Sequence, residues 1–360
     1  MGLSIYDTPL SAGQLEEYRS FLGSCGLRDE NDADFVVLET DDEGRLIACG
    51  ALAGHTIKQL AVSPSAEGQG LMASVVSLLI SEAAARGVFR LFLCTKPENR
   101  SMFGSLGFYE VVATDDAVLM ENRIGGADAF IESLKDEEDE EDGEDGSSGE
   151  SADCSSGSPG RGVRGAVVCN CDPFTLGHRH LIEYAAANCD YLYVFAVSES
   201  GSMFSPQERL ELIRRGTADI ANCHVYASDL YLISRATFPA YFIKDEAHAE
   251  EVKADLDIEF FSGRLAPALG ITKRFVGEEP LDPVTRAYNE RMKELLPARG
   301  ITLEEIPRLN DADGEIVSAG RVRTLIREAA SAAGDDLEAI LVRISEMVPA
   351  TTYETILKHI

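Results

Sequence analysis

The sequence predicts an α/β protein with two domains that are joined by an acidic, disordered linker. Three observations support this prediction. The 360 residues are too many for one ordinary domain. Segments with strand and helix periodicity alternate through much of the chain. The acidic residues are unevenly spread, and nine of the ten residues in Asp136–Asp145 are Asp or Glu.

Composition argues against two classes of partner. The formal net charge is −30, from 62 acidic and 32 basic residues, so the chain should repel phosphate backbones and anionic lipid. The N-terminus lacks the apolar core of a signal sequence, and apolar runs such as Tyr191–Val197 are far shorter than the ~20 residues of a membrane helix. Eight scattered cysteines do not suggest a disulfide framework. We therefore expect a cytoplasmic protein with no nucleic-acid or membrane partner.

Charge and composition also place the domain boundary. Residues 126–163 contain 13 acids and 2 bases and end in a run rich in Gly, Ser and Pro. Such a segment buries too little apolar surface to offset its ordering entropy, which predicts a disordered linker between domains 1–125 and 164–360. An acidic tether for a basic partner is the functional alternative.

The first domain is expected to be α+β. Helices are predicted at Ser11–Leu22, Leu71–Arg86 and Asn99–Leu106. Strands are predicted at Asp34–Glu39, Arg45–Leu52, Ile57–Val62, Phe89–Cys94 and Phe108–Val112.

The second domain alternates strand and helix, which implies a parallel, doubly wound sheet. Strands are predicted at Gly165–Cys169, Tyr191–Val197, Ile258–Phe261, Arg274–Val276 and Leu303–Ile306. Helices are predicted at Gly177–Asn188, Ser205–Ala218, Pro283–Leu296, Ala319–Ala330 and Leu337–Met347, with another near the C-terminus.

The most informative segment is the predicted strand–turn–helix Gly165–His178. An apolar strand ends at Asn170, and the sequence Thr175-Leu-Gly-His178 opens a helix. In open α/β sheets the ligand crevice lies beyond the carboxyl ends of the strands, and a helix N-terminus there suits phosphate. We expect Gly177 to leave space beside a phosphate and His178 to point into that space. The alternative is an ordinary strand–turn–helix with a structural histidine.

A second motif lies late in the chain, after the strand predicted at Leu303–Ile306. It reads Val317-Ser-Ala-Gly-Arg-Val-Arg323. Ser318 is placed to cap a helix, and Arg321 and Arg323 are of the type and spacing that bind a triphosphate. Together the two motifs resemble the T/H-x-G-H and I-S-x-S/T-x-x-R signatures of the adenylyl-transferring nucleotidyltransferases. Gly320 stands where that pattern has a second hydroxyl.

Further segments narrow this resemblance. They are Asn170–His178, Ile233–Lys244, Arg274–Pro280 and Asp282–Asn289. With the two motifs they resemble the citrate (pro-3S)-lyase ligase family, also called acetate:citrate lyase ligase. Asp172 departs from the asparagine that is usual in this family, and an added acid beside a nucleotide needs a magnesium ion or an arginine to offset it.

The resemblance implies a Rossmann-like domain and an ATP-dependent ligase. ATP and acetate give acetyl adenylate and pyrophosphate, and the acetyl group then passes to the thiol of the citrate lyase acyl carrier subunit, on its phosphoribosyl-dephospho-CoA prosthetic group. Mg²⁺ is the expected cofactor beside ATP. Thr175 and His178 are the expected catalytic residues. The expected nucleotide-binding residues are Asn170, Phe174, Gly177, Gly277, Glu278, Ser318, Arg321 and Arg323.

A motif in the first domain resembles a different family. Leu60–Pro64, the turn Glu67-Gly-Gln-Gly70 and a following helix resemble the pyrophosphate-binding turn of the GNAT acetyltransferases. Their pattern is Q/R-x-x-G-x-G/A, whereas this chain has Glu67 and Met72 at the first and last positions. We expect the fold, and the two departures argue against ordinary acetyl-CoA binding.

Three other interpretations remain. Cys169-x-Cys171 with His178 and His180 has the residue types of a zinc site, but no second cysteine pair accompanies them and no metal site is predicted. The chain could instead be an adenylyl- or cytidylyltransferase that makes a cofactor precursor. It could also be a non-catalytic regulatory relative that has kept the fold.

Overall fold

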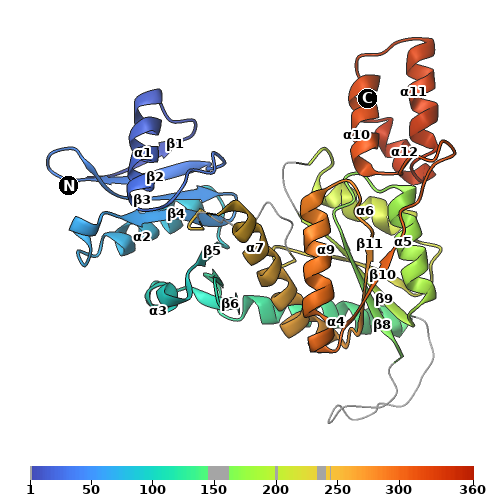
Figure 1. The fold of residues 1–360 in the computed structure, drawn as a ribbon, viewed down its shortest axis with the longest axis horizontal. Coiled ribbons are helices and arrows are strands. Elements are labelled where there is room, and N and C mark those ends of the chain that lie inside the picture. Colours follow the sequence, from blue (N-terminus) through green and yellow to red (C-terminus); the bar gives the residue numbers. More distant parts are fainter. Residues whose placement is uncertain (1, 145–161, 199–201, 233–240, 244) are drawn as a thin grey trace. The chain divides into compact units, whose positions relative to one another are not determined.

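The computed structural model describes residues 2–144, 162–198, 202–232, 241–243 and 245–360 (Figure 1). The chain divides into two compact units. The first unit contains Met1–Ala129 and Arg235–Phe260, and the second contains Phe130–Ser234 and Phe261–Ile360. The described residues form two sheets, a seven-stranded sheet in the first unit and a five-stranded sheet in the second. The predicted α/β class is confirmed.

The sheet of the first unit has the strand order β1-β2-β3-β4-β5-β7-β6. Its strands are β1 (Gly2–Asp7), β2 (Phe35–Thr40), β3 (Leu46–Ala53), β4 (Thr56–Val62), β5 (Phe92–Thr95), β6 (Tyr109–Ala113) and β7 (Val118–Glu121). Its helices are α1 (Ala12–Ser24), α2 (Leu71–Ala85), α3 (Arg100–Ser105) and α7 (Glu246–Phe260). Neighbouring strands are antiparallel except β4 and β5, which are parallel.

The parallel pair β4–β5 is paired only at its start. Thr56 pairs with Phe92 and Ile57 with Leu93, and no further pairing follows between these strands in the described residues. The later residues of β4 therefore diverge from β5.

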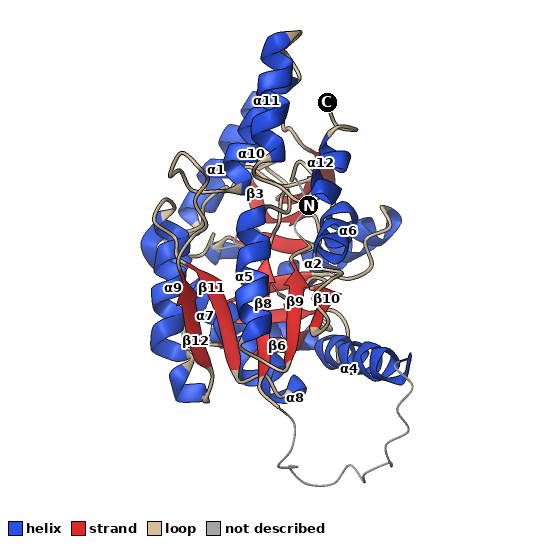
Figure 2. Cartoon of the chain, turned by 90° about the vertical axis from the view of Figure 1, so that its right-hand side faces the viewer, coloured by secondary structure: helices blue, strands red, loops and turns tan. Residues whose placement is uncertain are grey.

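The sheet of the second unit is parallel throughout, with the order β10-β9-β8-β11-β12 (Figure 2). Its strands are β8 (Arg164–Cys169), β9 (Tyr191–Ala196), β10 (Cys223–Ala227), β11 (Lys273–Gly277) and β12 (Thr302–Ile306). The chain order reverses beside β8, so the first strand of the unit lies between β9 and β11. Such a switch point is where open α/β sheets bind ligands.

The helices of this unit that follow β8 lie between its strands or, for the last three, after β12. They are α5 (Leu176–Ala187), α6 (Pro206–Gly216), α8 (Ala266–Leu269), α9 (Pro283–Leu295), α10 (Ala319–Ala329), α11 (Asp335–Ser345) and α12 (Ala350–Ile356). Helix α5 lies across the sheet and contacts β8, β9 and β11 (Figure 2). Its buried residues join those of the strands in one core cluster. None of the helices within the described ranges combines the length and apolar character needed to cross a bilayer.

The helix α7 corrects one predicted strand. Ile258–Phe261 was expected to be a strand, but residues up to Phe260 belong to α7. Ala249, Val252, Leu256 and Phe260 are buried at intervals of three or four residues, which is the spacing of one helix face. The short apolar run was ambiguous because it has no strand alternation. Strands β1, β7 and β10 were not predicted.

The helix α4 (Gly126–Glu144) corrects the start of the expected linker. The sequence placed disorder from residue 126, but Phe130, Ile131 and Leu134 are buried. Phe130 also packs on Tyr231, with ring centroids 5.0 Å apart. Acidic residues elsewhere on the helix masked this apolar face in the composition. Residues 145–161 of the predicted linker lie outside the described residues.

One acid of this run is docked in the core. Glu138 is 4% exposed and forms an ion pair with Arg164 at the start of β8. Tyr193 donates to Glu138 at 2.6 Å, and Arg164 also donates to the Leu269 carbonyl at 2.6 Å. A buried ion pair needs such extra hydrogen bonds to offset the loss of water, so this acid is a structural residue rather than a solvated one.

The first unit also takes residues from the second half of the chain, which the boundary at residue 164 did not anticipate. Helix α7 packs on β6. The Arg28 backbone N–H donates to the Tyr241 carbonyl at 3.2 Å, and Arg28 forms an ion pair with Glu246 at 3.3 Å. Residues 233–240 and 244 of the family-like segment Ile233–Lys244 lie outside the described residues.

Leu134→Ala should destabilise the protein by about 2–5 kcal/mol, because it removes a buried side chain from α4. Lys135→Ala is the matched control, since Lys135 is 40% exposed, and it should change stability by less than about 0.5 kcal/mol. Denaturant unfolding measures both values. Equal stabilities for the two variants would mean that α4 is not packed and belongs to the disordered linker.

Candidate active site

The turn between β8 and α5 carries the first predicted motif. Cys171 has a φ of 51°, a left-handed conformation that is unusual for a residue with a side chain. The buried Arg209 donates to the Asn170 carbonyl at 3.1 Å and so supports the turn from α6. Thr175 is 1% exposed and caps α5. The predicted strand–turn–helix is therefore present, with its helix N-terminus at the carboxyl end of β8.

Thr175 and His178 bind each other in a reciprocal cap. The His178 backbone N–H donates to Thr175 Oγ1 at 3.3 Å, and the Thr175 backbone N–H donates to His178 Nδ1 at 3.1 Å. Because Nδ1 accepts a hydrogen bond, the proton of the neutral imidazole is assigned to Nε2. The cap thus fixes the ring and leaves an Nε2–H donor at the helix N-terminus.

His178 is held in its neutral form. Burial, and after it the nearby guanidinium groups of Arg308 and Arg323, together lower the pKa of its imidazole from 6.5 to about 4. A neutral histidine can donate one hydrogen bond without bringing a charge of its own. The positive charge beside it comes from the arginines instead.

Gly177 brings the two motifs together. A Cβ at position 177 would lie 2.7 Å from the Val317 carbonyl oxygen, a distance that no side chain tolerates. The expectation that Gly177 leaves room for a phosphate is therefore wrong in its detail, because the Val317 backbone occupies that space. The glycine permits close packing of the second motif on α5.

The second motif begins α10 as predicted. Ser318 caps the helix by accepting from the Arg321 backbone N–H at 3.3 Å. The Arg321 side chain turns away to Asp311, with an ion-pair distance of 2.8 Å, and donates to the Ile316 carbonyl at 2.7 Å. Both of its terminal nitrogens are therefore bonded to the chain itself.

Arg323 is oriented differently and offsets the added acid at position 172. It donates to the Asp172 carbonyl oxygen and lies 3.6 Å from a carboxylate oxygen of the same residue. The Asp172 carboxylate also accepts from the backbone N–H groups of Met203 and Phe204, at 3.3 and 3.0 Å. From the sequence, either a magnesium ion or an arginine was expected to offset the charge of Asp172, and the structure places Arg323 there.

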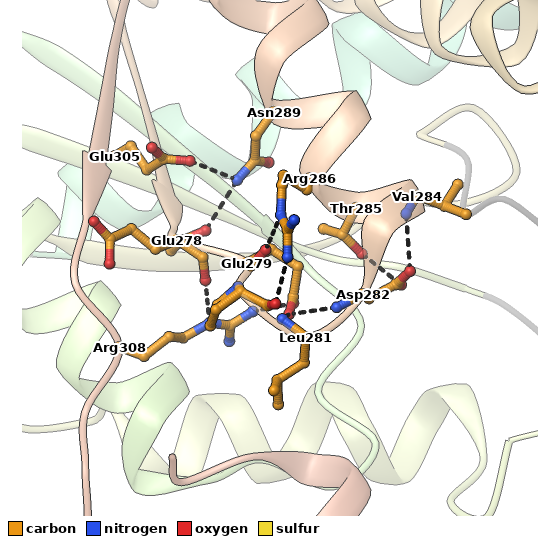
Figure 3. A network of polar contacts seen from close by, with 12 residues as sticks. Glu278, Glu279, Leu281, Asp282, Val284, Thr285, Arg286, Asn289, Glu305 and Arg308 are labelled. Carbon is orange, nitrogen blue, oxygen red and sulfur yellow. Dashed lines mark hydrogen bonds and ion pairs between the residues drawn. The ribbon is translucent and has the colours of Figure 1, made fainter. Parts of the chain in front are cut away.

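The predicted residues of β11 lie at its carboxyl end. Gly277 is the last residue of the strand, and its carbonyl accepts from Asn289 of α9 at 3.0 Å. Glu278 follows and is exposed. Glu278 and Asn289 belong to the polar network drawn in Figure 3, which links the ends of β11 and β12 to the start of α9.

Phe174 is not placed to contact a nucleotide. It is completely buried, and a Cβ at Gly216 would lie 2.4 Å from its ring. Its ring stacks on that of His178, with centroids 6.0 Å apart and planes at 14°. Phe174 therefore supports His178 from the core, and the expectation of a direct nucleotide contact is corrected.

Sequence reasoning missed Arg308, Glu279 and Asp311. Arg308 binds Glu279 and the Glu278 carbonyl, and Asp311 binds Arg321. Arg308 comes two residues after β12 ends at Ile306, so the rule about carboxyl ends that selected Gly277 would have selected it too.

The first unit holds a separate pocket of about 780 Å³ where β4 and β5 diverge. Leu60, Ala61 and Val62 of β4 line one side, and Thr95 and Lys96 line another. The GNAT-like turn contributes Glu67, Gly68, Gly70 and Met72 to the lining. Most of the remaining lining is apolar, so the pocket suits a narrow chain with few charges.

Comparison with known families agrees with both parts of the chain. Residues 164–356 match the family described as citrate lyase ligase C-terminal domain, and residues 4–110 match the acetyltransferase (GNAT) family. The first match contains the Thr175–His178 and Val317–Arg323 motifs. The second contains the splayed strands, and the predicted GNAT fold of the first unit is confirmed.

Similar proteins match almost end to end. A citrate (pro-3S)-lyase ligase from Klebsiella pneumoniae is 40% identical over 86% of this chain and 85% of its own length. One from Escherichia coli K12 is 38% identical over 96% of this chain and 92% of its own length. One from Haemophilus influenzae is 35% identical, over 94% of each chain. The chain belongs to the citrate lyase ligase family.

Proposed function

We propose that the protein is a ligase that activates citrate lyase by ATP-dependent acetylation of the thiol on its acyl carrier subunit. The observation that carries this proposal is the contact of Gly177 with Val317, because it sets the two predicted phosphate-binding helix starts side by side. Membership of the family supplies the identity of the target.

The reaction has two steps. In the first, a carboxylate oxygen of acetate attacks the α-phosphorus of ATP, and the bond to the β-phosphate oxygen breaks to release pyrophosphate. In the second, the carrier thiol loses its proton and attacks the acetyl carbon, and AMP leaves with the mixed-anhydride oxygen. Neither step needs a covalent bond to the protein, so the residues act by positioning and by neutralising charge.

The α-phosphate is assigned to the start of α5. Thr175 fixes the ring of His178, and the Nε2–H of His178 donates to a phosphate oxygen as charge develops there. The N-terminus of α5 adds its positive partial charge. Asn170 and Gly277, at the ends of the adjoining strands β8 and β11, line the nucleotide beside it.

The β- and γ-phosphates are assigned to the start of α10, with Ser318, Arg321 and Arg323. Arg323 is already turned toward the Thr175 motif through Asp172. Arg321 reaches a phosphate only by exchanging its bond to Asp311, which lies in a half-buried turn. Glu278 is exposed at the same edge of the sheet and is assigned to the nucleoside end.

Mg²⁺ fits this site as part of Mg·ATP. The carboxylates of Asp172, Glu279 and Asp311 are each engaged by an arginine. Mg²⁺ commonly keeps several waters and binds through substrate phosphates with one or two carboxylates. The ion would neutralise phosphate charge, and its ligands would come from ATP and water.

The carrier's prosthetic arm is assigned to the pocket of the first unit. The arm is a dephospho-CoA derivative, so it is long, narrow and ends in a thiol. The pocket between β4 and β5 offers a largely apolar lining for such a chain. Glu67 beside the turn disfavours a free diphosphate, which matters less for an arm that arrives attached to its protein.

His178→Ala should lower acetate-dependent pyrophosphate release by roughly 10²–10³-fold, the usual cost of one lost donor to a developing charge. His180→Ala, two residues further along α5, is the control and should stay near wild type. Circular dichroism and thermal melting check that both variants fold. Normal turnover in His178→Ala would show that His178 does not act in the active site.

His178 should stay neutral as the pH falls from 8 to about 5, because burial and two guanidinium groups hold its pKa near 4. The unfolded state takes up a proton near pH 6.5, so this residue's contribution to stability is complete above that pH and is lost as the pH falls toward 4. Imidazole ¹⁵N shifts would report the titration directly. The His178→Gln variant should lose less stability than wild type between pH 7 and 5. Titration of His178 near 6.5 would contradict the assignment.

Ala73→Trp should fill the pocket from α2, since Ala73 lines it. Pyrophosphate release with acetate alone should be unchanged, whereas acetylation of the carrier thiol should fall at least tenfold. Ala85→Trp is the control, because Ala85 is exposed at the end of the same helix. If Ala73→Trp acetylates the carrier as fast as wild type, the arm does not use this pocket.

A further inference from the structure

We infer that Arg308 binds the phosphate chain of ATP and that Glu279 is the residue that positions it. The inference rests on the proposed function, because it takes ATP to bind beside Thr175 and His178. Arg308 belongs to neither sequence motif. It lies in the segment that follows β12, at the same edge of the sheet as the ends of β8 and β11.

The guanidinium of Arg308 is fixed along one edge. Its Nε donates to the Glu278 carbonyl, and its Nη2 pairs with Oε2 of Glu279 (Figure 3). Glu279 is itself held, because its Oε1 accepts from the backbone N–H groups of Leu281 and Asp282, both at 3.1 Å. The turn before α9 therefore sets the position of the carboxylate, and the carboxylate sets the position of the arginine.

The fixed guanidinium lies over the end of the neighbouring strand. A Cβ at Gly277 would be 3.5 Å from Arg308 Nε and 3.6 Å from its Cζ. Gly277 ends β11, which pairs directly with β8. Arg308 thus follows the edge strand β12, but its guanidinium lies at the end of β11. The next strand, β8, leads into the turn that carries His178. The lowered pKa of His178 is consistent with this position.

Part of the Arg308 head group remains available. Within the described ranges, Nη1 makes no hydrogen bond, and the side chain is 28% exposed. Arg321 differs, since both its terminal nitrogens are bonded to the chain. Phosphate accepts N–H donors from arginine most strongly when the planar group is already oriented. Both groups are oriented, but only Arg308 keeps a terminal nitrogen for a phosphate, because those of Arg321 are already engaged.

The test compares binding of three probes: ATP, inorganic triphosphate and adenosine. Arg308→Gln should weaken ATP and inorganic triphosphate about 10- to 100-fold, the range for a lost charge-assisted hydrogen bond, and leave adenosine unchanged. Arg308→Lys keeps the charge without the planar fork and should lie between Gln and wild type. Arg327→Gln is the control, because Arg327 is exposed in the last turn of α10.

Glu279→Gln tests the positioning role. The KM for ATP should rise several-fold while the KM for acetate and the melting temperature stay near wild type. A purely structural role would instead lower the melting temperature and raise both KM values, which would overturn this part.

Two outcomes separate the inference from the function on which it rests. If wild type binds ATP and Arg308→Gln binds it within twofold, or loses adenosine equally, Arg308 is not a phosphate ligand. If wild type neither binds ATP nor releases pyrophosphate with acetate, the proposed function itself fails.

Discussion

The candidate site depends on one close approach, that of the Val317 carbonyl to the α-carbon of Gly177. With any side chain at position 177, α10 would have to move away from α5, because the nearest obstacle is backbone and cannot rotate aside. The approach aligns two helix starts that are about 140 residues apart in the sequence. The charged groups of the site are therefore positioned by the packing of α10 on α5.

The candidate site contains positively charged side chains although the protein as a whole is strongly acidic. The protein carries a formal net charge of −30, yet Arg308 and Arg323 lie near a neutral histidine, and Arg321 lies in the first turn of α10. Each is paired with a carboxylate: Arg308 with Glu279, Arg321 with Asp311 and Arg323 with Asp172. The pairs reduce the repulsion among the arginines and hold each head group in a defined direction. An anion that binds Arg308 need not order this long side chain, which lowers the entropic cost of binding.

Local sequence was a good guide where chain geometry is local. The strand–turn–helix at Thr175 and the Ser318 cap follow from residue type and spacing alone, and both are present. The sequence could not reveal that Asp172 meets Arg323, because that contact joins residues 151 apart. The place of Arg308 after β12 could have been read from the sequence, but its contact with Gly277 on the neighbouring strand could not. In α4, the acids dominated the composition although Phe130 and Leu134 form a buried face. In α7, an apolar run without alternation fitted strand and helix equally. The sequence therefore failed to predict two kinds of feature. One is contact between residues far apart in the chain, and the other is an apolar helix face within a segment of mostly acidic residues.

The interleaving of the two units along the chain has a consequence for synthesis on the ribosome. The first unit ends its first segment at Ala129 and resumes at Arg235. At 5–20 residues per second, about 5–20 s pass before the ribosome delivers the missing part. Until then β6 lacks its partner α7, and the Arg28 amide lacks the Tyr241 carbonyl. During that interval most of the central strands of the second unit have emerged. The nascent N-terminal segment must therefore wait, incomplete, while the later sheet is already assembling.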